Sequence, residues 1–207
     1  MFSDKIKIIM MIIGILIIIS GLFTLFNNSE QANTAIDQTS DNEQKENESE
    51  NIELERNTLL NGKLSILIPK SFNIMTDEEI KQANPNIENV PIIYANKEGT
   101  VNIIFTYTTD QVTEEDITTL KDEIANNIDQ IHPLAKLIEE SLTDINGKVI
   151  GIVEIITPGK YTEVYSLILF TDLEERLLTI NISLPKDQIG QWKPIIDQII
   201  NSLEVNE

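Results

Sequence analysis

Apolar and polar residues alternate in several short runs of this chain, which is the pattern of strands in an antiparallel sheet. The run NIELERNTLLNGKLSILIP (51–69) carries Asn61-Gly62 between its halves, and this dipeptide favours a tight hairpin turn. The run PIIYANKEGTVNIIFTYT (91–108) predicts a second hairpin that turns around residues 96–99. Four more antiparallel strands are predicted in AKLIEESLTDI (135–145), KVIGIVEIIT (148–157), YTEVYSLILFT (161–171) and RLLTINIS (176–183). Turns are expected between them at Asn146-Gly147, Pro158-Gly159 and DLEE (172–175).

Three further segments show the start signals and the apolar spacing of α-helices. Thr76-Asp-Glu-Glu79 is a capping box that opens a short helix ending before Pro85. The residues TEED (113–116) open a longer helix that ends at His132-Pro133. Its predicted buried stripe consists of Ile117, Leu120, Ile124, Ile128 and Ile131. A last helix is predicted near Gln191–Leu203, with Pro194 in its first turn and a buried face of Ile195, Ile196, Ile199, Ile200 and Leu203.

Two of the predicted strands are apolar on both of their faces, which indicates a sheet that is covered on both sides. On the strand 148–157, Ile150, Ile152 and Ile156 occupy one face, and Val149, Val153 and Ile155 occupy the other. The hairpin turns make this sheet antiparallel, and the two longer helices lie far apart in sequence. We therefore expect an α+β fold, an α/β/α sandwich around a central antiparallel sheet.

An uncharged segment near the N-terminus, from Ile8 to Phe26, contains only Ser20 and Thr24 as polar residues. As a helix, it spans roughly 28 Å at about 1.5 Å per residue, close to the roughly 30 Å hydrocarbon core of a bilayer. We expect residues 1–26 to form a short cytoplasmic tip and one retained transmembrane helix, a signal-anchor. A buried core helix is an alternative, disfavoured because the segment is apolar all round.

A cleaved signal peptide is the other alternative for this segment. Cleavage after Ala35 would place Asn33 at a position that prefers a small residue. The flanking charges give the anchor a direction, because Lys5 and Lys7 precede it and Lys45 is the only basic residue from 27 to 51. The positive-inside rule then predicts a cytoplasmic N-terminus and an extracytoplasmic C-terminal domain.

Residues 27–51 are rich in Asn, Gln, Ser, Thr and acidic residues, and Ile36 is their one branched apolar residue. Such a segment buries too little apolar surface to offset the entropy of ordering it. We expect a disordered acidic linker there, with a charged surface helix as the alternative. Residues 52–207 are then the extracytoplasmic domain, and they are long enough to form a core of their own.

The chain is strongly acidic, with 34 acidic and 15 basic side chains and a formal net charge of −19. This charge repels phosphate backbones, so nucleic acid is not an expected partner. The chain contains no cysteine, which excludes disulfides, thiolate catalysis and Cys-ligated zinc or iron–sulfur clusters. It also excludes lipoprotein processing, which needs a cysteine to acylate.

Candidate chemistry in the sequence is sparse. His132 is the only histidine, and its place at a predicted helix end suits a structural role beside the helix dipole better than catalysis or metal binding. Asp110, Glu114, Glu115 and Asp116 cluster before the long helix, where acidic residues are favoured by the dipole; weak calcium binding is the alternative, without EF-hand spacing. Trp192 is expected to pack in the core, with a contact to a partner as the alternative. No catalytic, cofactor-binding or metal-binding residue is assigned, and no cofactor is expected.

The segment LSILIPKSF (64–72) resembles the opening strand, proline, bend and aromatic residue of the PsbP-like superfamily, which includes bacterial envelope members of the DcrB and LpqN kind. The order Asn146-Gly147-Lys148, LLTINIS (177–183), Trp192 and a terminal helix through Asn201-Ser202-Leu203 is similar as well, so the resemblance covers residues 58–205. It implies an antiparallel-sheet sandwich that binds or stabilises partners, usually without catalysis. Phe72 stands where many relatives have Trp, and no functional residue is carried over.

These observations predict a non-enzymatic, single-pass protein of the cell membrane that acts as an accessory, assembly or partner-binding factor at the cell envelope. Its expected partners are the membrane, through the N-terminal helix, and an envelope protein or wall component. A small-ligand-binding or sensing module is the alternative function. A cell-wall hydrolase is a further alternative, for which the sequence offers abundant carboxylates but no nucleophile–base pair around His132.

Overall fold

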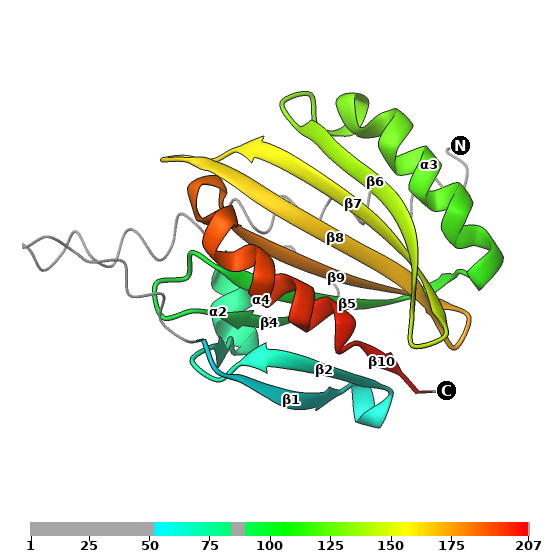
Figure 1. Cartoon of the computed structure of the whole chain (residues 1–207), viewed down its shortest axis with the longest axis horizontal. Coiled ribbons are helices and arrows are strands. Elements are labelled where there is room, and N and C mark those ends of the chain that lie inside the picture. Colours follow the sequence, from blue (N-terminus) through cyan, green and yellow to red (C-terminus); the bar gives the residue numbers. More distant parts are fainter. Residues whose placement is uncertain (1–51, 84–89, 207) are drawn as a thin grey trace, which may run out of the picture.

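The computed structural model describes residues 52–83 and 90–206. The predicted anchor (1–26) and linker (27–51) lie outside the described residues, so both remain predictions. Within the described ranges, no helix is long and apolar enough to cross a membrane. The described residues form two antiparallel sheets and three α-helices (Figure 1).

The central sheet has seven antiparallel strands in the order β3-β4-β5-β9-β8-β7-β6. The four consecutive strands and the hairpin around residues 96–99 that the sequence predicts are confirmed, whereas the very short β3 was not predicted. The strands are β3 (Asn73–Ile74), β4 (Ile92–Ala95), β5 (Asn102–Gln111), β6 (Lys136–Ile145), β7 (Lys148–Pro158), β8 (Glu163–Leu173) and β9 (Arg176–Pro185).

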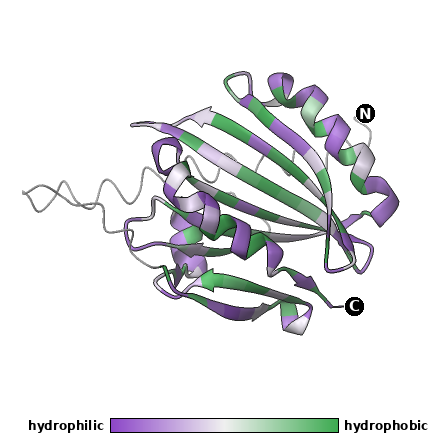
Figure 2. Ribbon diagram, in the orientation of Figure 1, coloured by the Kyte–Doolittle hydropathy of each residue, from purple (hydrophilic) through white to green (hydrophobic). Residues whose placement is uncertain are grey.

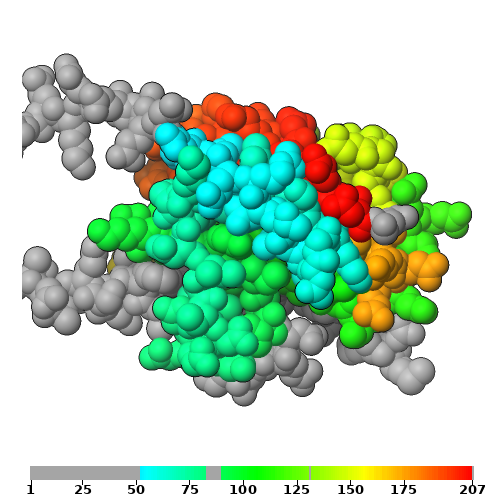
Figure 3. Space-filling model, turned by 90° about the horizontal axis from the view of Figure 1, so that it is seen from below, coloured from blue at the N-terminus to red at the C-terminus, as the bar shows by residue number. Residues whose placement is uncertain are grey.

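A second, smaller sheet has the order β1-β2-β10. The predicted first hairpin is confirmed in β1 (Leu54–Leu59) and β2 (Leu64–Pro69), and Asn61 in its turn has a φ of 57°. The third strand, β10 (Glu204–Val205), comes from the end of the chain and was not predicted. Figure 3 shows the N-terminal strands, in cyan, lying beside the C-terminal residues, in red.

Three helices connect or follow the strands: α2 (Asp77–Ala83), α3 (Glu114–Ile131) and α4 (Ile189–Asn201). The predicted capping box of α2 is present, since Glu79 accepts from the Thr76 N–H at 2.7 Å. The start of α3 has a capping box as well, in which Asp116 accepts from the Thr113 N–H at 3.1 Å. The last helix begins two residues earlier than the predicted Gln191. Pro194 is therefore the sixth residue of α4 and not a first-turn residue.

The central sheet is covered on both faces, as its doubly apolar strands predict. On one face α3 packs Ile117, Leu120, Ile124 and Ile128 against β7 and β8, and Ile80 of α2 joins the same cluster. On the other face lie α4, through Trp192, Ile196 and Ile199, and the small sheet, through Leu64, Ile66 and Ile68. The predicted helical layers are thus present, but on the second face the layer is shared with a sheet. In Figure 2, β2 is hydrophobic along most of its length, whereas the outer β1 is largely hydrophilic.

Candidate functional site

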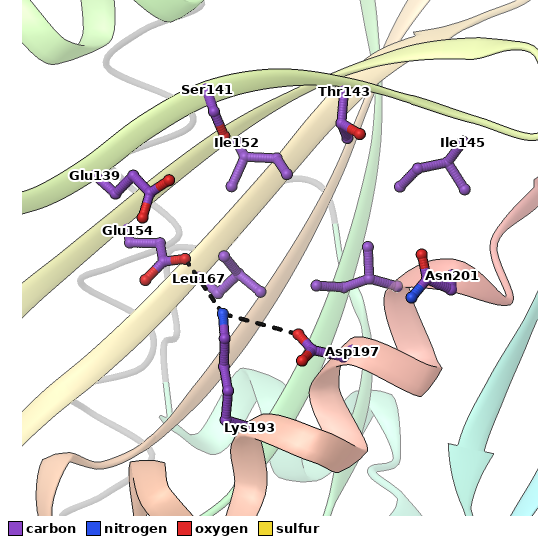
Figure 4. Close-up of a pocket in the computed structure, with 11 residues that line it drawn as sticks. Glu139, Ser141, Thr143, Ile145, Ile152, Glu154, Leu167, Lys193, Asp197 and Asn201 are labelled. Atoms are coloured by element: carbon purple, nitrogen blue, oxygen red, sulfur yellow. Dashed lines mark ion pairs between the residues drawn. The ribbon is translucent and has the colours of Figure 1, made fainter.

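A groove of about 240 Å³ lies between α4 and the strands β6, β7 and β8. Its walls carry Glu139, Ser141 and Thr143 of β6 on one side and Lys193, Asp197 and Asn201 of α4 on the other (Figure 4). The floor is apolar where Ile152 and Leu167 meet Ile200. Pockets for drug-sized ligands measure about 300–1,000 Å³, so this groove is better matched to one or two side chains than to a cofactor.

The periodicity of each element places these side chains on the groove. Along β6, residues 139, 141 and 143 share one face because side chains alternate along a strand. On α4, residues 193, 197 and 201 are spaced by four and therefore line one face of the helix. The two-residue turn at Asn146-Gly147, with φ values of 53° and 83°, fixes the register that sets β6 beside β7.

The groove holds three carboxylates and one ammonium group. Lys193 lies between two of the carboxylates, with its Nζ 3.7 Å from Glu154 Oε1 and 3.8 Å from Asp197 Oδ1 (Figure 4). The Tyr165 hydroxyl donates a hydrogen bond of 2.8 Å to Glu154 Oε2. Burial raises the pKa of Tyr165 well above its usual range, and the hydrogen bond to the Glu154 carboxylate raises it further. Tyr165 therefore stays protonated and holds Glu154 in place.

Glu139 is the carboxylate of the groove that the surrounding residues do not neutralise. It lies directly opposite Glu154 in the β6–β7 register, and like charges in that position destabilise a sheet. Among the residues that the structure describes, Glu139 has neither an ion pair nor a side-chain hydrogen bond. The groove thus carries an excess of negative charge beside β6, which suits a cationic group from outside.

A second hollow, of about 660 Å³, lies at the start of α4. It is lined by Phe72 and Trp192 on one side and by the turn of Asn96, Lys97 and Glu98 on the other. The rings of Phe72 and Trp192 are in contact, with centroids 5.8 Å apart. Trp192 is buried and belongs to the core, as the sequence predicts, although the edge of that core borders this hollow.

The structure does not bring the sequence's candidate chemical residues into the groove. His132 caps the C-terminal end of α3, and its backbone N–H donates to the Ile128 carbonyl at 2.8 Å. Because α3 and α4 cover opposite faces of the sheet, His132 is kept away from the groove carboxylates. In the acidic cluster before α3, Asp116 accepts from the Thr113 hydroxyl at 2.8 Å, as a helix cap does.

The calcium alternative for this cluster receives no support. Within residues 52–83 and 90–206, no three His, Asp or Glu side chains are close enough together to hold a metal ion. The three carboxylates of the groove likewise form no such site, and two of them, Glu154 and Asp197, already face Lys193.

No sequence motif indicates the groove residues Glu139, Glu154, Lys193 and Asp197. Each is one charged residue among many in an acidic chain, and none belongs to a motif. The one available signal was the spacing of Lys193 and Asp197 on the predicted last helix, which places a cation and an anion on the same face.

Comparison of the sequence alone finds nothing: no family model matches the chain, and no curated protein matches it. The fold is more informative. The structure of CyanoP, the cyanobacterial PsbP of Synechocystis sp. PCC 6803, superposes with a TM-score of 0.55 over 73% of this chain and 92% of that chain, at 15% identity. The domain has the PsbP-like fold.

Two further structures resemble this PsbP-like domain less closely. LpqN of Mycobacterium tuberculosis, involved in cell envelope biogenesis, gives a TM-score of 0.48 at 10% identity and covers 76% of this chain and 92% of that chain. The Ran-binding protein Mog1p of Saccharomyces cerevisiae gives 0.45 at 11% identity and covers 74% and 96%. At such identities the likeness concerns the fold alone.

Proposed function

We propose that this protein is a non-enzymatic, single-pass membrane protein whose PsbP-like domain binds a protein partner on the extracytoplasmic side of the membrane. It acts there as an accessory or assembly factor of the cell envelope. The observation that carries the proposal is the acidic groove between α4 and β6, which offers an unneutralised Glu139 beside the Glu154–Lys193–Asp197 cluster.

The nature of this groove favours a protein partner over a substrate. Glu154, Lys193 and Asp197 are held by one another and by Tyr165, and no charged group of the groove is arranged as a nucleophile with a base. Its volume accommodates side chains, and the strand beside it offers a long exposed border. The acidic linker and the N-terminal apolar segment support the anchoring part of the proposal, since together they provide a tether close to a membrane.

Photo-crosslinking in intact cells tests the proposal. A photoreactive amino acid replaces Ser141, whose side chain lines the groove, in the full-length protein. The expected result is a discrete crosslinked product containing one recurrent envelope protein. The matched control places the same amino acid at Thr118, an exposed position on α3 across the sheet, and should give no such product. Identical products from both positions, or none from Ser141, would contradict the proposal.

Cell fractionation tests the location independently. We expect the full-length protein in the membrane fraction, released by detergent but not by alkaline carbonate, with the domain accessible to external protease in spheroplasts. A protein found mainly in the culture medium would overturn the predicted anchor.

The hollow beside Phe72 and Trp192 favours a second candidate, a small-ligand-binding or sensing module. Its volume of about 660 Å³ lies in the range of known ligand pockets. Trp192 is the single tryptophan of the chain, so a bound ligand would change its fluorescence directly. A fluorescence screen of polar metabolites that leaves the emission of Trp192 unchanged would remove this candidate.

A further inference from the structure

Strand β6 forms one edge of the central sheet, and it pairs with β7 alone among the strands that the structure describes (Figure 1). It is ten residues long, whereas β3 at the opposite edge has only two residues. A long free edge is a template for another strand, which proteins usually shorten, cover or charge. This edge therefore offers unpaired backbone N–H and C=O groups to another strand.

The register shows which part of β6 can accept another strand. Ile145 and Lys148 flank the two-residue turn and form the hydrogen-bonded pair that closes the hairpin. Pairs then alternate along the strand, so Asp144, Leu142 and Glu140 direct their N–H and C=O groups away from β7. A bulge between Leu137 and Glu139 interrupts the ladder further back. The regular, available stretch is thus residues 139–145.

The two faces of this edge have different chemistry. On the α4 side, Glu139 lies over the groove with its excess negative charge. On the α3 side, Leu137 and Leu142 are 37% and 39% exposed and lie on the same face as Glu140 and Asp144. A strand laid along β6 would continue both faces, because its own side chains alternate in the same way.

We infer that β6 accepts an extended segment of the partner as an eighth strand, with lysine or arginine side chains on the α4 side and apolar side chains on the α3 side. This inference rests on the proposed function and names the kind of partner that the groove binds. Charge complementarity selects the occupant. Glu139, Glu140 and Asp144 repel a second copy of this acidic strand, whereas a cationic side chain on the α4 side of a partner strand neutralises Glu139.

In this arrangement, main-chain hydrogen bonds to Glu140, Leu142 and Asp144 supply most of the affinity, and the side-chain pockets supply the specificity. A cationic side chain of the partner would lie opposite Glu139 and form an ion pair with it. Lys193 stays with Glu154 and Asp197, so the partner's cation does not have to displace it.

The test uses the full-length protein in detergent micelles and capped nine-residue peptides in which Lys and Val alternate. Binding is measured by fluorescence anisotropy at low salt. Two N-methylated peptides, which differ only in which alternate N–H groups are blocked, provide the decisive comparison. Blocking the frame that faces β6 should weaken binding at least tenfold, whereas blocking the other frame should leave it within twofold.

Protein variants give a second, independent test. Glu139→Lys should weaken binding of the Lys/Val peptide at least tenfold and should allow binding of a Glu/Val peptide. Glu140→Lys is the matched control, because residue 140 is on the same strand but on the α3 face beside Lys121. It should change the ratio of Lys/Val to Glu/Val peptide binding less than Glu139→Lys does. Leu142→Pro removes an N–H that points away from β7, so it should abolish binding while the Trp192 fluorescence of the folded domain is retained.

The outcomes separate this inference from the proposed function. Equal binding of both N-methylated peptides, or no effect of Glu139→Lys, overturns strand addition even if Ser141 still crosslinks to an envelope protein. No crosslink from Ser141 overturns the proposed function itself. A protein that sediments as a dimer, and as a monomer after Leu142→Pro, would show that the occupant is a second copy and would also overturn the inference.

Discussion

Glu139 is a side chain placed where it costs stability in the free domain. It faces Glu154 across β6 and β7, and nothing in the described part of the chain neutralises it. We predict that Glu139→Gln increases the free energy of unfolding by about 0.5 kcal/mol, because it removes a repulsion between like charges on neighbouring strands. Urea denaturation of the purified protein, followed by Trp192 fluorescence, measures this change.

The matched control for Glu139 is its neighbour Glu140, whose Oε1 lies 3.3 Å from Lys121 Nζ. Glu140→Gln removes an attraction and not a repulsion, so its stability should stay equal or fall slightly. If Glu139→Gln lowered the stability instead, Glu139 would have a stabilising neighbour and the groove would not be short of positive charge.

Two buried threonines also lower the stability of the domain. Thr106 of β5 and Thr179 of β9 lie opposite each other in the sheet, both buried, and neither hydroxyl has a hydrogen-bond partner among the described residues. A buried polar group without a partner costs about 1–3 kcal/mol. We predict that Thr179→Val stabilises the domain by about 1 kcal/mol and that adding Thr106→Val stabilises it further.

Thr171 provides the contrast for these substitutions. It is equally buried, but its Oγ1 donates to the Val149 carbonyl at 2.8 Å. Thr171→Val should therefore destabilise the domain by about 1 kcal/mol in the same denaturation experiment. Loss of stability in Thr179→Val as well would mean that water or a ligand satisfies the unpaired hydroxyls.

A contact between two side chains can be predicted from the sequence when the two residues are close together in the chain. The caps at Thr76 and Thr113 were predictable because both partners lie within three residues of each other. Glu139 and Lys193 are more than fifty positions apart in the chain, and only the packing of α4 across β6 and β7 brings them to one groove. Their proximity follows from tertiary structure, which no local pattern contains.

Among the elements, the hairpin from β8 to β9 has a turn with unsuitable residues. Glu174 and Glu175 have φ values of 52° and 57°, a left-handed conformation that residues other than Gly rarely adopt. We predict that Glu175→Gly stabilises the domain by about 1 kcal/mol, because glycine adopts this conformation without steric strain. Thermal and urea unfolding measure the change, and the ion pair between Lys63 and Glu174 stays in place.

Glu98 is the control for this turn, since it lies in the turn between β4 and β5 but does not have a positive φ. Glu98→Gly should lower the stability by about 0.5–1 kcal/mol, because glycine only adds freedom to the unfolded chain there. Equal effects of the two substitutions would mean that backbone strain at Glu175 is not a significant cost.

Elements with strong periodicity or a favoured turn were predicted well. The turn at Asn146-Gly147 and the doubly apolar strands β7 and β8 could be predicted because turn type and side-chain alternation are local properties. The two-residue strands β3 and β10 are too short to have a period, so they could not be predicted. The start of α4 was misplaced because the chain enters it through a 3-10 turn at Lys186–Gln188 and no side-chain cap marks its first residue.

In the molecule as a whole, contacts between the two ends of the described chain join the small sheet to the end of α4. β10 pairs with β2 at only two positions, but Ser202 extends this contact. Its Oγ accepts from the Leu67 N–H at 2.8 Å and donates to the Ile199 carbonyl at 2.6 Å. Arg56 adds a hydrogen bond of 3.3 Å from its Nη1 to the Ser202 carbonyl. The end of α4 thus joins the small sheet to the layer that forms the groove.

We predict that Ser202→Ala destabilises the domain by about 1–3 kcal/mol, because it leaves the Leu67 N–H without a partner at a half-buried position. The loss of protection against hydrogen exchange should differ from strand to strand. Hydrogen exchange should accelerate most at the amides of β1 and β2, which this contact holds in place, and least at β7 and β8 of the central sheet. Ser141→Ala, on the edge strand β6 and without a side-chain hydrogen bond among the described residues, is the control and should change the stability by less than about 0.5 kcal/mol. Equal acceleration in all strands would mean that the small sheet and the central sheet unfold as one unit, so that partner binding at β6 would stabilise β1 and β2 as strongly as β7.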